Sequence, residues 1–290
     1  MELKNRFRVT SETVFPRKDL AEKHGFSVCK AVICMMVTSR ENKIFKTAKL
    51  LKTQKGRAEK GLFMLEGFRL VKDALSKGVN AECIILKDGT DVSLKTDCPS
   101  YTFAPRLFDD ISETVNSQGV IALCRMEKKA LQDIIKEEKN CVIMCEALQD
   151  PGNIGTIIRT AHGADCGGVV LTKGCCDLYN PKIVRATMSG MFAIPVVQGQ
   201  ESFGCIEYFR ENGYKIVAGA LTEDAVDFYS ADLSGKVLII IGNEGNGVEK
   251  STLSLCDSVL KIPMRPDAES LNASVAGSVM IYEHYRQNIL

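Results

Sequence analysis

The chain has 290 residues, of which 45% are hydrophobic and 25% are charged, so it can bury a core and lacks the composition of a disordered protein. The formal net charge of +1 excludes a uniformly basic protein of the histone kind, and no apolar run approaches the roughly 18–20 residues of a membrane helix. The 12 cysteines show no Cys-x-x-Cys spacing and the 3 histidines are far apart, so we expect reduced thiols in the cytoplasm and no metal site.

Residues 1–35 differ in pattern from the rest of the chain. They mix charges without a clear hydrophobic period. The apolar stretch near their end is interrupted by Lys30 and lacks a small-residue cleavage site, which argues against a secretory signal. The sequence that follows Met35 reads as a fresh beginning. We therefore expect residues 1–35 to be a poorly ordered extension that precedes the folded chain.

Basic residues concentrate just after this extension. Residues 36–125 carry a net charge of +4 and residues 126–290 carry −6, whereas the 21 residues 40–60 alone carry +6. Lysines at every third position around a narrow apolar seam predict one amphipathic helix over Lys43–Gln54. Such a helix is either a solvated face or a surface that binds phosphate groups. The candidate RNA-binding residues are Arg40, Lys43, Lys46, Lys49, Lys55 and Arg57.

Alternating helices and strands are predicted from residue 36 onward. The elements expected in residues 36–126 are a strand at Leu62–Glu66, a helix at Gly67–Lys77 and strands at Ala81–Leu86 and Gly119–Cys124. Residues 127–140 are charged and are interpreted as a linker with helical character. From Cys141 the alternation is regular, which predicts a mostly parallel α/β sheet. The strands expected there are Cys141–Ala147, Val169–Leu171, Ile194–Val197, Lys215–Ala220, Val237–Gly242 and Ser258–Ile262, and the helices are Gly155–Ala164, Pro181–Ser189, Glu201–Asn212, Lys250–Leu255 and Leu271–Tyr285.

Three loops that follow predicted strands hold the candidate functional residues, because ligands bind outside the carboxyl ends of strands in such sheets. They are residues 149–155, 242–248 and 262–274, and the first leads into a helix that carries Arg159. The glycines of the second loop follow a Gly-x-x-Gly-x-Gly order, which fits neither a dinucleotide fingerprint nor a phosphate-binding loop. Each feature alone is also compatible with a plain turn, an exposed arginine or, for Glu244, a helix-cap partner.

Together the three loops resemble the motifs of the SpoU (TrmH) family of RNA ribose methyltransferases, in the SPOUT superfamily. The segments that carry the resemblance are, in chain order, Asn153-Ile-Gly155 with Arg159, Leu238–Val248, and Ile262-Pro-Met264 with Ser270–Ala276. The upstream positions that resemble the small substrate-binding domain of the family are Ser39, Asn42, Glu66-Gly67 and Ser117-Gln-Gly119. Ala273 stands where many members carry valine, and residues 1–35 have no counterpart.

The resemblance implies an enzyme that moves the methyl group of S-adenosylmethionine to a ribose 2′-oxygen of RNA. It implies an α/β fold in which residues 141–290 form a trefoil-knotted, mostly parallel-sheet methyltransferase domain, while residues 36–126 form a smaller RNA substrate-binding domain. It also implies a homodimer built by the first and last helices of the catalytic domain. The backbone of Gly242, Ile262 and Leu271 corresponds to the sites that hold the cofactor.

The resemblance further implies a catalytic set, which consists of Asn153, Arg159, Glu244, Ser270 and Asn272. A guanidinium is a poor base, so we expect Arg159 to clamp the neighbouring phosphate and to stabilise charge that develops on the reacting oxygen. We expect Glu244 to hold Arg159 through a bidentate pair, and the amide and hydroxyl side chains to orient the ribose or the arginine. Added bulk at Gly242 is expected to weaken cofactor binding strongly.

Ribosomal RNA is the favoured substrate, because the N-terminal domain type is common among family members that act on it. Three alternatives stay open. The acceptor is a ribose of transfer RNA, or it is an RNA base, or the chain is a ribosome-assembly factor that binds RNA without chemistry. The presence of Arg159, Glu244 and Asn272 weighs against the third alternative. No residue identifies the nucleotide that is modified.

Overall fold

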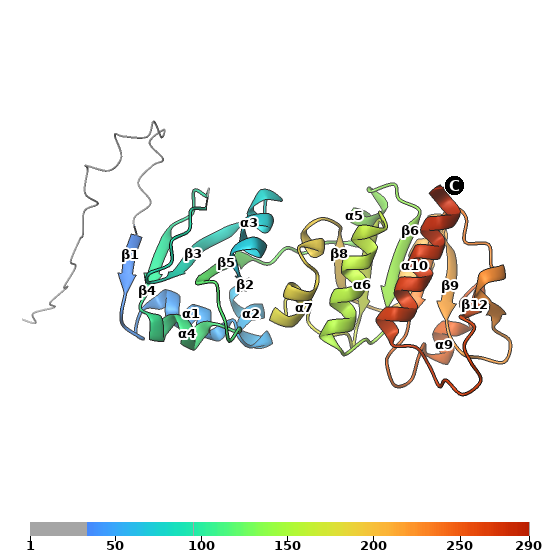
Figure 1. Ribbon diagram of the computed structural model, residues 1–290. Helices are drawn as coiled ribbons and strands as arrows, with labels where there is room; N and C mark the ends of the chain where they lie inside the picture. Colours follow the sequence, from blue (N-terminus) through green and yellow to red (C-terminus); the bar gives the residue numbers. More distant parts are fainter. Residues whose placement is uncertain (1–33, 95, 290) are drawn as a thin grey trace, which may run out of the picture. The chain divides into compact units, whose positions relative to one another are not determined.

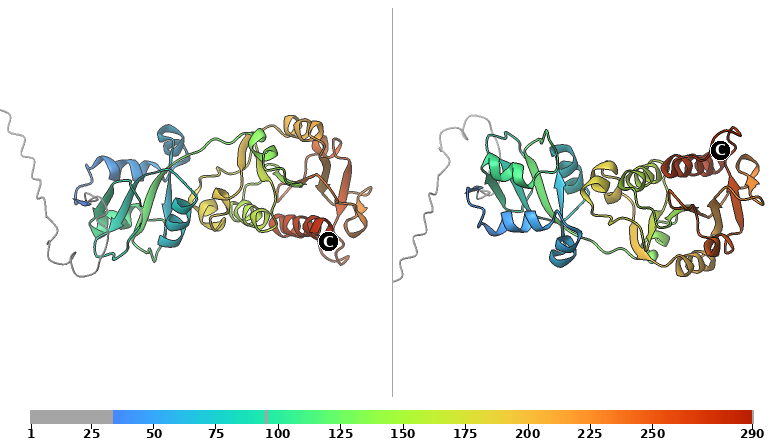
Figure 2. Two further views of the ribbon diagram at one scale, coloured as in Figure 1. Left: turned by 90° about the horizontal axis from the view of Figure 1, so that it is seen from above. Right: turned by 90° about the horizontal axis from the view of Figure 1, so that it is seen from below.

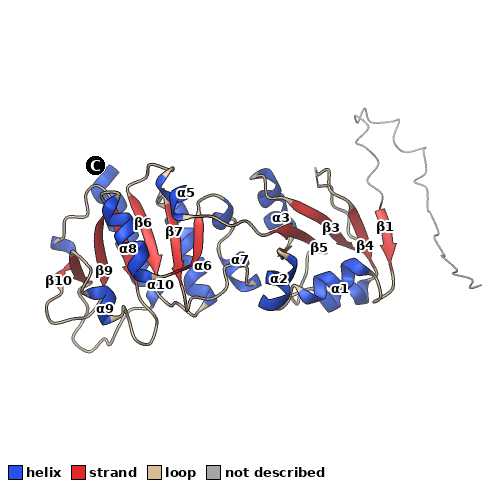
Figure 3. Cartoon of the chain, turned by 180° about the vertical axis from the view of Figure 1, so that it is seen from behind, coloured by secondary structure: helices blue, strands red, loops and turns tan. Residues whose placement is uncertain are grey.

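The computed structural model describes residues 34–94 and 96–289, and these residues form two sheets flanked by helices (Figures 1 and 3). The first sheet has five strands in the order β1-β4-β3-β5-β2, and the second has seven strands in the order β10-β12-β9-β11-β6-β7-β8. Among the helices of these residues, none combines the length and the apolar character that crossing a membrane requires.

The first sheet is mixed, with parallel pairs on one side and antiparallel pairs on the other. Its strands are β1 (Cys34–Val37), β2 (Leu62–Glu66), β3 (Ala81–Lys87), β4 (Ser100–Phe103) and β5 (Val120–Arg125). The accompanying helices are α1 (Lys43–Leu50), α2 (Gln54–Lys60), α3 (Phe68–Ser76) and α4 (Pro105–Ile111). Aromatic side chains such as Phe103 and Phe108 are fully buried in its core.

The basic segment forms two helices, and the prediction of one helix over Lys43–Gln54 is wrong. The side-chain oxygen of Asn42 accepts a hydrogen bond from the backbone N–H of Ile44 at 2.8 Å and starts α1. The Thr53 hydroxyl accepts one from the N–H of Gly56 at 3.1 Å and starts α2. Threonine favours such capping positions over the interior of a helix, and it therefore divides the segment.

Besides α2, three elements of the first sheet region were not predicted, namely β1, β4 and α4. Strand β1 begins at Cys34, so Cys34 and Met35 belong to the sheet and not to the predicted extension. The rest of that extension lies outside the described residues. Each of these strands has only four residues, which is too short for a clear alternation of apolar and polar side chains.

The second sheet confirms the predicted parallel α/β arrangement, because all of its neighbouring strands run parallel. Its strands are β6 (Cys141–Cys145), β7 (Gly168–Thr172), β8 (Val196–Gln200), β9 (Lys215–Gly219), β10 (Val226–Asp227), β11 (Val237–Ile241) and β12 (Ser258–Lys261). Its helices are α5 (Leu131–Ile135), α6 (Pro151–Gly163), α7 (Pro181–Ala186), α8 (Ser202–Glu211), α9 (Lys250–Leu253) and α10 (Ala273–Ile289), with 3-10 turns η2 (Gly190–Phe192) and η3 (Phe228–Ser230). Every residue of β6, β7 and β11 is buried, as expected for strands covered on both faces.

The order of the strands brings distant loops to one edge of the sheet. Strand β11 lies between β6 and β9, and β12 pairs with β9. Because these strands are parallel, the loops that follow them leave the sheet at the same edge. Helix α10 then returns along α6 (Figures 1 and 2), where the hydroxyl oxygens of Thr160 and Ser278 lie 3.1 Å apart.

Arg57 was predicted to contact RNA, and the structure buries it instead. Its Nε and Nη2 donate hydrogen bonds to Oδ2 of Asp177 at 2.8 and 2.5 Å, and its Nη1 donates to the carbonyl oxygen of Leu51 at 2.9 Å. The side chains of Arg57 and Asp177 are 4% and 10% exposed. Arg57 is therefore an internal ion-pair partner that links α2 to the segment before α7, and it is not available to a phosphate group.

We expect Arg57→Met to lower the free energy of unfolding by about 3–5 kcal/mol, because it leaves the Asp177 carboxylate buried without its counter-charge. Asp177→Asn in the same chain removes that charge and should restore most of the loss. Denaturant unfolding of the single and double variants measures both effects. If the single variant Arg57→Met and the double variant were equally destabilised, Arg57 would not stabilise the fold through this ion pair.

Candidate cofactor and catalytic site

Two of the three predicted loops line one cavity of about 680 Å³. Residues 242–248 form one wall, and Ile262 and residues 270–273 form another. A segment that was not predicted, Gly219–Thr222 after β9, completes the lining. The remaining lining side chains are mostly apolar, and Glu244 and Lys250 are the only two among the lining residues that carry a full charge. A cavity of this size with few polar groups is typical of a site for a small organic ligand.

The second loop is a tight hairpin that depends on glycine. The backbone N–H groups of Asn243 and Gly247 each donate to the other residue's carbonyl oxygen, at 3.0 and 2.9 Å. A Cβ atom on Gly242 would lie 2.1 Å from the carbonyl carbon of Gly247 and 2.2 Å from the nitrogen of Val248. Bulk at Gly242 thus displaces the loop's own backbone, which is a more direct effect than the predicted interference with a ligand.

Glu244 joins this hairpin to the first loop. Its carboxylate accepts hydrogen bonds from the backbone N–H of Asp150 at 3.0 Å, from that of Gln149 at 3.3 Å and from Nδ2 of Asn153 at 3.0 Å. Desolvation by itself would raise the pKa of Glu244, but the hydrogen bond from Asn153 and those from the backbone outweigh it and hold the pKa below the usual value. The carboxylate is therefore ionised at neutral pH.

The expected ion pair between Glu244 and Arg159 is not formed. The Arg159 side chain is exposed, lies outside the cavity lining and makes no hydrogen bond or ion pair within the part of the chain that the structure describes. The apolar side of α6, which includes Ile154, Ile157 and Ile158, is fully buried. The helical period then turns Arg159 toward solvent, whereas Asn153 in the first turn is only 6% exposed and reaches Glu244.

The third loop places the remaining predicted residues at the cavity. Asn272 starts α10, because its Oδ1 accepts hydrogen bonds from the N–H of Ser274 at 2.9 Å and from its hydroxyl at 2.7 Å. Ser270 and Leu271 are exposed and line the cavity together with Ile262 and Gly242. The structure thus brings Gly242, Glu244, Ile262, Ser270, Leu271 and Asn272 to one cavity, with Asn153 beside it and Arg159 outside.

A further acidic residue that sequence reasoning missed supports the cavity wall. Glu146 follows β6 and is only 3% exposed. Its carboxylate accepts hydrogen bonds from the hydroxyls of Ser202 and Thr252 at 2.7 and 2.5 Å and from the backbone N–H of Glu249 at 2.9 Å. The signal in the sequence was an acidic residue directly after a continuous apolar strand. A residue in such a place is near the core, and acidic residues are rarely buried there without hydrogen-bond partners.

The predicted basic surface divides into free and paired side chains. Arg40 forms an ion pair with Asp110 at 2.7 Å, and Lys46 forms one with Glu41. Lys43, Lys49 and Lys55 are exposed, and no ion pair of theirs occurs within residues 34–94 and 96–289. The last three are therefore the cations of this surface that are available to a phosphate backbone.

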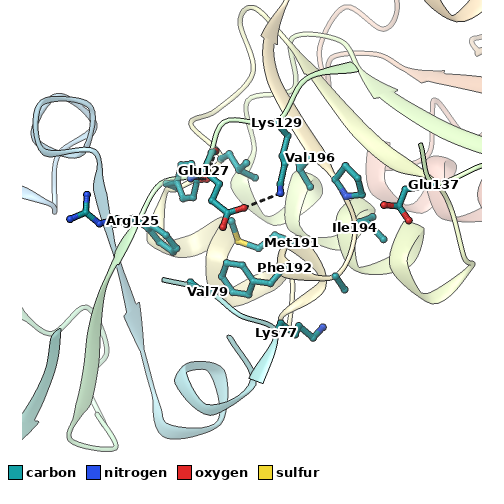
Figure 4. A pocket seen from close by; sticks show the side chains of 15 residues that line it. Lys77, Val79, Arg125, Glu127, Lys129, Glu137, Met191, Phe192, Ile194 and Val196 are labelled. Atoms are coloured by element: carbon teal, nitrogen blue, oxygen red, sulfur yellow. Dashed lines mark hydrogen bonds and ion pairs between the residues drawn. The ribbon is translucent and has the colours of Figure 1, made fainter. Parts of the chain in front are cut away.

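A second cavity of about 310 Å³ lies elsewhere in the structure (Figure 4). Its lining combines apolar side chains such as Met191 and Phe192 with charged groups of both signs, and two of these groups, Glu127 and Lys129, form an ion pair at 2.9 Å. None of the predicted site residues lines it. The larger cavity at the loops after β11 and β12 is therefore the candidate functional site.

Comparison with known proteins agrees with this assignment. Residues 140–282 match the SpoU rRNA Methylase family, and residues 42–122 match the MRM3-like substrate binding domain. The 23S rRNA (guanosine(2553)-2′-O)-methyltransferase RlmP of Bacillus subtilis is 34% identical over 249 residues, which cover 85% of this chain and 97% of that protein.

Solved structures show the same similarity. An AdoMet-bound rRNA methyltransferase from Sinorhizobium meliloti has a TM-score of 0.79 at 30% identity, and the match covers 89% of this chain and 99% of that chain. The SpoU methyltransferase AviRb from Streptomyces viridochromogenes, in complex with AdoMet, has a TM-score of 0.76 at 27% identity over 85% of this chain and 98% of that chain. The α/β methyltransferase fold with an N-terminal substrate-binding domain is thus shared with these proteins.

We expect Gly242→Ala to lower the free energy of unfolding by about 1–3 kcal/mol, because the new methyl group overlaps the backbone of residues 247 and 248. The same substitution should lower the affinity for S-adenosylmethionine, the cofactor expected from the sequence. Gly245→Ala is the matched control, since its Cβ would meet only Oδ1 of Asn243 at an ordinary 3.5 Å. Calorimetry on both variants measures the difference, and equal behaviour of the two would contradict the packing argument.

Proposed function

Because the chain belongs to the SpoU rRNA methylase family, we propose that it transfers the methyl group of S-adenosylmethionine to a ribose 2′-oxygen of ribosomal RNA. The observation that carries this proposal is the single cavity formed by Gly242, Ile262 and Leu271 together with Glu244. Ribosomal RNA is preferred over transfer RNA because RlmP, a relative over nearly its whole length, is named for 23S rRNA.

The residues of the cavity fit S-adenosylmethionine, which supplies an electrophilic methyl group on a sulfonium when it is bound. Backbone N–H and C=O groups of Gly242, Ile262 and Leu271 would read the edge of an adenine ring, and the apolar lining would cover its faces. The ionised Glu244 gives this cavity a negative charge that favours a cationic donor. We assign the orientation of the acceptor ribose to Ser270 and Asn272, which line the cavity.

The role expected for Arg159 points to a second copy of the chain. Arg159 does not line the cavity of its own chain, whereas the resemblance implies that it acts beside the acceptor oxygen. Val275 and Tyr282 are 48% and 51% exposed on α10, beside α6, and they offer an apolar surface for a partner. We therefore propose a homodimer through the α6–α10 face, in which Arg159 of one protomer serves the cavity of the other by holding a phosphate and the developing oxyanion.

Arg159→Ala is expected to lower kcat for methyl transfer by about 10²–10³-fold, because one donor to the developing charge is lost. Arg159→Lys should lose nearly as much, since an ammonium cannot reproduce the two-pronged guanidinium bond. When Arg159→Ala and Gly242→Ala chains are co-expressed, each mixed dimer should have one intact site, which joins the cavity of the first chain to the arginine of the second. About half of the dimers in a statistical mixture are mixed, so the expected rate is about a quarter of the wild-type rate. No recovery in purified mixed dimers would mean that Arg159 acts within its own chain.

Lys43, Lys49 and Lys55 are proposed to hold the RNA backbone. They are exposed and form no ion pair in the described part of the chain, and they lie in the region that matches a substrate-binding domain. Residues 126–290 carry a net charge of −6, so most of the attraction to RNA has to come from the N-terminal part. The lysines add affinity without selecting a sequence, because phosphate contacts position the RNA and base contacts specify it.

The triple variant with glutamine at Lys43, Lys49 and Lys55 should bind RNA more weakly, and the slope of log affinity against log salt should fall by about 2–3. Glutamine at Lys139, Lys173 and Lys215 is the matched control, because each of these lysines already has a carboxylate partner. Filter binding of a ribosomal RNA fragment at several salt concentrations gives both slopes. An equal change in both variants would refute the assignment.

We further propose the division of the chain that its sequence predicts, with residues 1–35 as an extension, 36–126 as the substrate-binding domain, 127–140 as a linker and 141–290 as the methyltransferase domain. The two separate sheets support the main boundary. Limited proteolysis tests it, because the first cuts within residues 36–290 should fall in 127–140. Cytoplasmic location is part of the proposal, since the ten cysteines with described side chains are free thiols, and cell fractionation tests it.

The trefoil knot implied by the family is also proposed for residues 141–290. What supports it is that α10 packs on α6 and β11 after β12 has paired with β9 on the side away from β11. Stretching the chain from residues 141 and 289 in a single-molecule experiment tests this. A knotted chain stays shorter than its contour length, and full extension would refute the knot.

The proposed function is tested by incubating the purified chain with labelled S-adenosylmethionine and ribosomal RNA, followed by nucleoside analysis. The expected product is one 2′-O-methylated nucleoside. A base-methylated nucleoside, or methylation of transfer RNA alone, would replace the proposal by the corresponding alternative. RNA binding without any methyl transfer would identify an assembly factor.

A further inference from the structure

The candidate cavity is lined by two charged side chains, and different parts of the chain hold them. Glu244 is bonded to the first loop and to α6, because Asn153 and the backbone of Gln149 and Asp150 donate to its carboxylate. Lys250 is the first residue of α9 and lines the cavity together with Leu253. The cavity therefore combines a carboxylate that is already bonded within the protein with one ammonium group.

Hydrogen bonds hold the backbone around Lys250 in place, whereas its ammonium group has no partner among the described residues. The preceding residue, Glu249, donates its N–H to the buried Glu146 at 2.9 Å, and Thr252 donates its hydroxyl to the same carboxylate at 2.5 Å. Both ends of the first turn of α9 are thus held. The Lys250 side chain is exposed at the cavity and has no hydrogen bond or ion pair with any other described residue.

These two charges match the methionine portion of S-adenosylmethionine. That portion carries a sulfonium cation and, a few bonds further along, a carboxylate and an ammonium group. The carboxylate of Glu244 already has hydrogen-bond donors within the protein, so Lys250 is the charged group of the lining that is left to bind the carboxylate of this portion. A lysine ammonium is a compact point charge that suits a single exposed carboxylate.

We propose that Lys250 recognises the carboxylate of the amino-acid tail of S-adenosylmethionine. The proposal rests on the proposed function, since it assumes this cofactor in the cavity, and it adds a residue that none of the three motifs includes. Lys250 selects for an intact amino-acid tail, whereas the backbone of the three loops recognises the adenosine. An RNA phosphate is the other anion that the ammonium of Lys250 can bind, and an assay without RNA separates the two.

The test compares two ligands that both lack the sulfonium charge and differ in the amino-acid tail. S-adenosylhomocysteine has the tail, and 5′-methylthioadenosine does not. We expect Lys250→Met to lower the affinity for S-adenosylhomocysteine about tenfold, because one charge-assisted contact is lost. The affinity for 5′-methylthioadenosine should change by less than about twofold. Lys250→Arg should keep most of the affinity for S-adenosylhomocysteine. Lys182→Met, at an exposed lysine of α7 outside the cavity, is the control for the lost charge.

Isothermal titration calorimetry on the purified chain without RNA gives the dissociation constants. Suppose that the wild-type chain binds both ligands and that Lys250→Met lowers the affinity for both equally or for neither. Lys250 then does not recognise the amino-acid tail, and the proposed function stands. Normal affinity for S-adenosylhomocysteine combined with weaker RNA binding would assign Lys250 to a phosphate group. A wild-type chain that binds neither ligand would overturn the proposed function and this inference together.

Discussion

The carboxylate of Glu244 holds the candidate site together. Two loops from separate strands meet where this group accepts N–H donors from Gln149, Asp150 and Asn153 while its own backbone stays in the tight hairpin after Gly242. A carboxylate can accept several donors at once, and each of these hydrogen bonds is charge-assisted. The same residue therefore sets the shape of the cavity wall and its negative potential.

A second set of contacts connects the basic surface to the first loop. Asp177 bonds to Arg57 of α2, and the adjacent Cys176 donates its N–H to the carbonyl oxygen of Leu148 at 3.0 Å. Leu148 directly precedes the residues whose N–H groups bond to Glu244. Three hydrogen bonds thus connect α2, in the proposed RNA-binding segment, with the wall of the cavity.

The elements that the sequence predicts well are those whose pattern is local. Continuous apolar runs identify β6 and β11, and glycine and asparagine at strand ends identify the loops that line the cavity. Pairings across long distances were not predictable. Arg57 has the same local character as the neighbouring lysines and is buried only because Asp177, 120 residues away, meets it. Glu244 likewise takes partners 91 to 95 residues away in place of the expected arginine.

The charges divide the work between the two parts of the chain. Residues 126–290 have a net charge of −6, so the proposed binding of RNA relies on exposed lysines elsewhere in the chain. The cavity itself is lined by two charged groups of opposite sign, Glu244 and Lys250, which we assign to the proposed cofactor. Arg159 lies outside this cavity on the solvent side of α6, and the proposed homodimer is the arrangement that would bring it to a cavity. In that proposal, the exposed arginine and the exposed apolar residues of α10 are two consequences of one requirement for assembly.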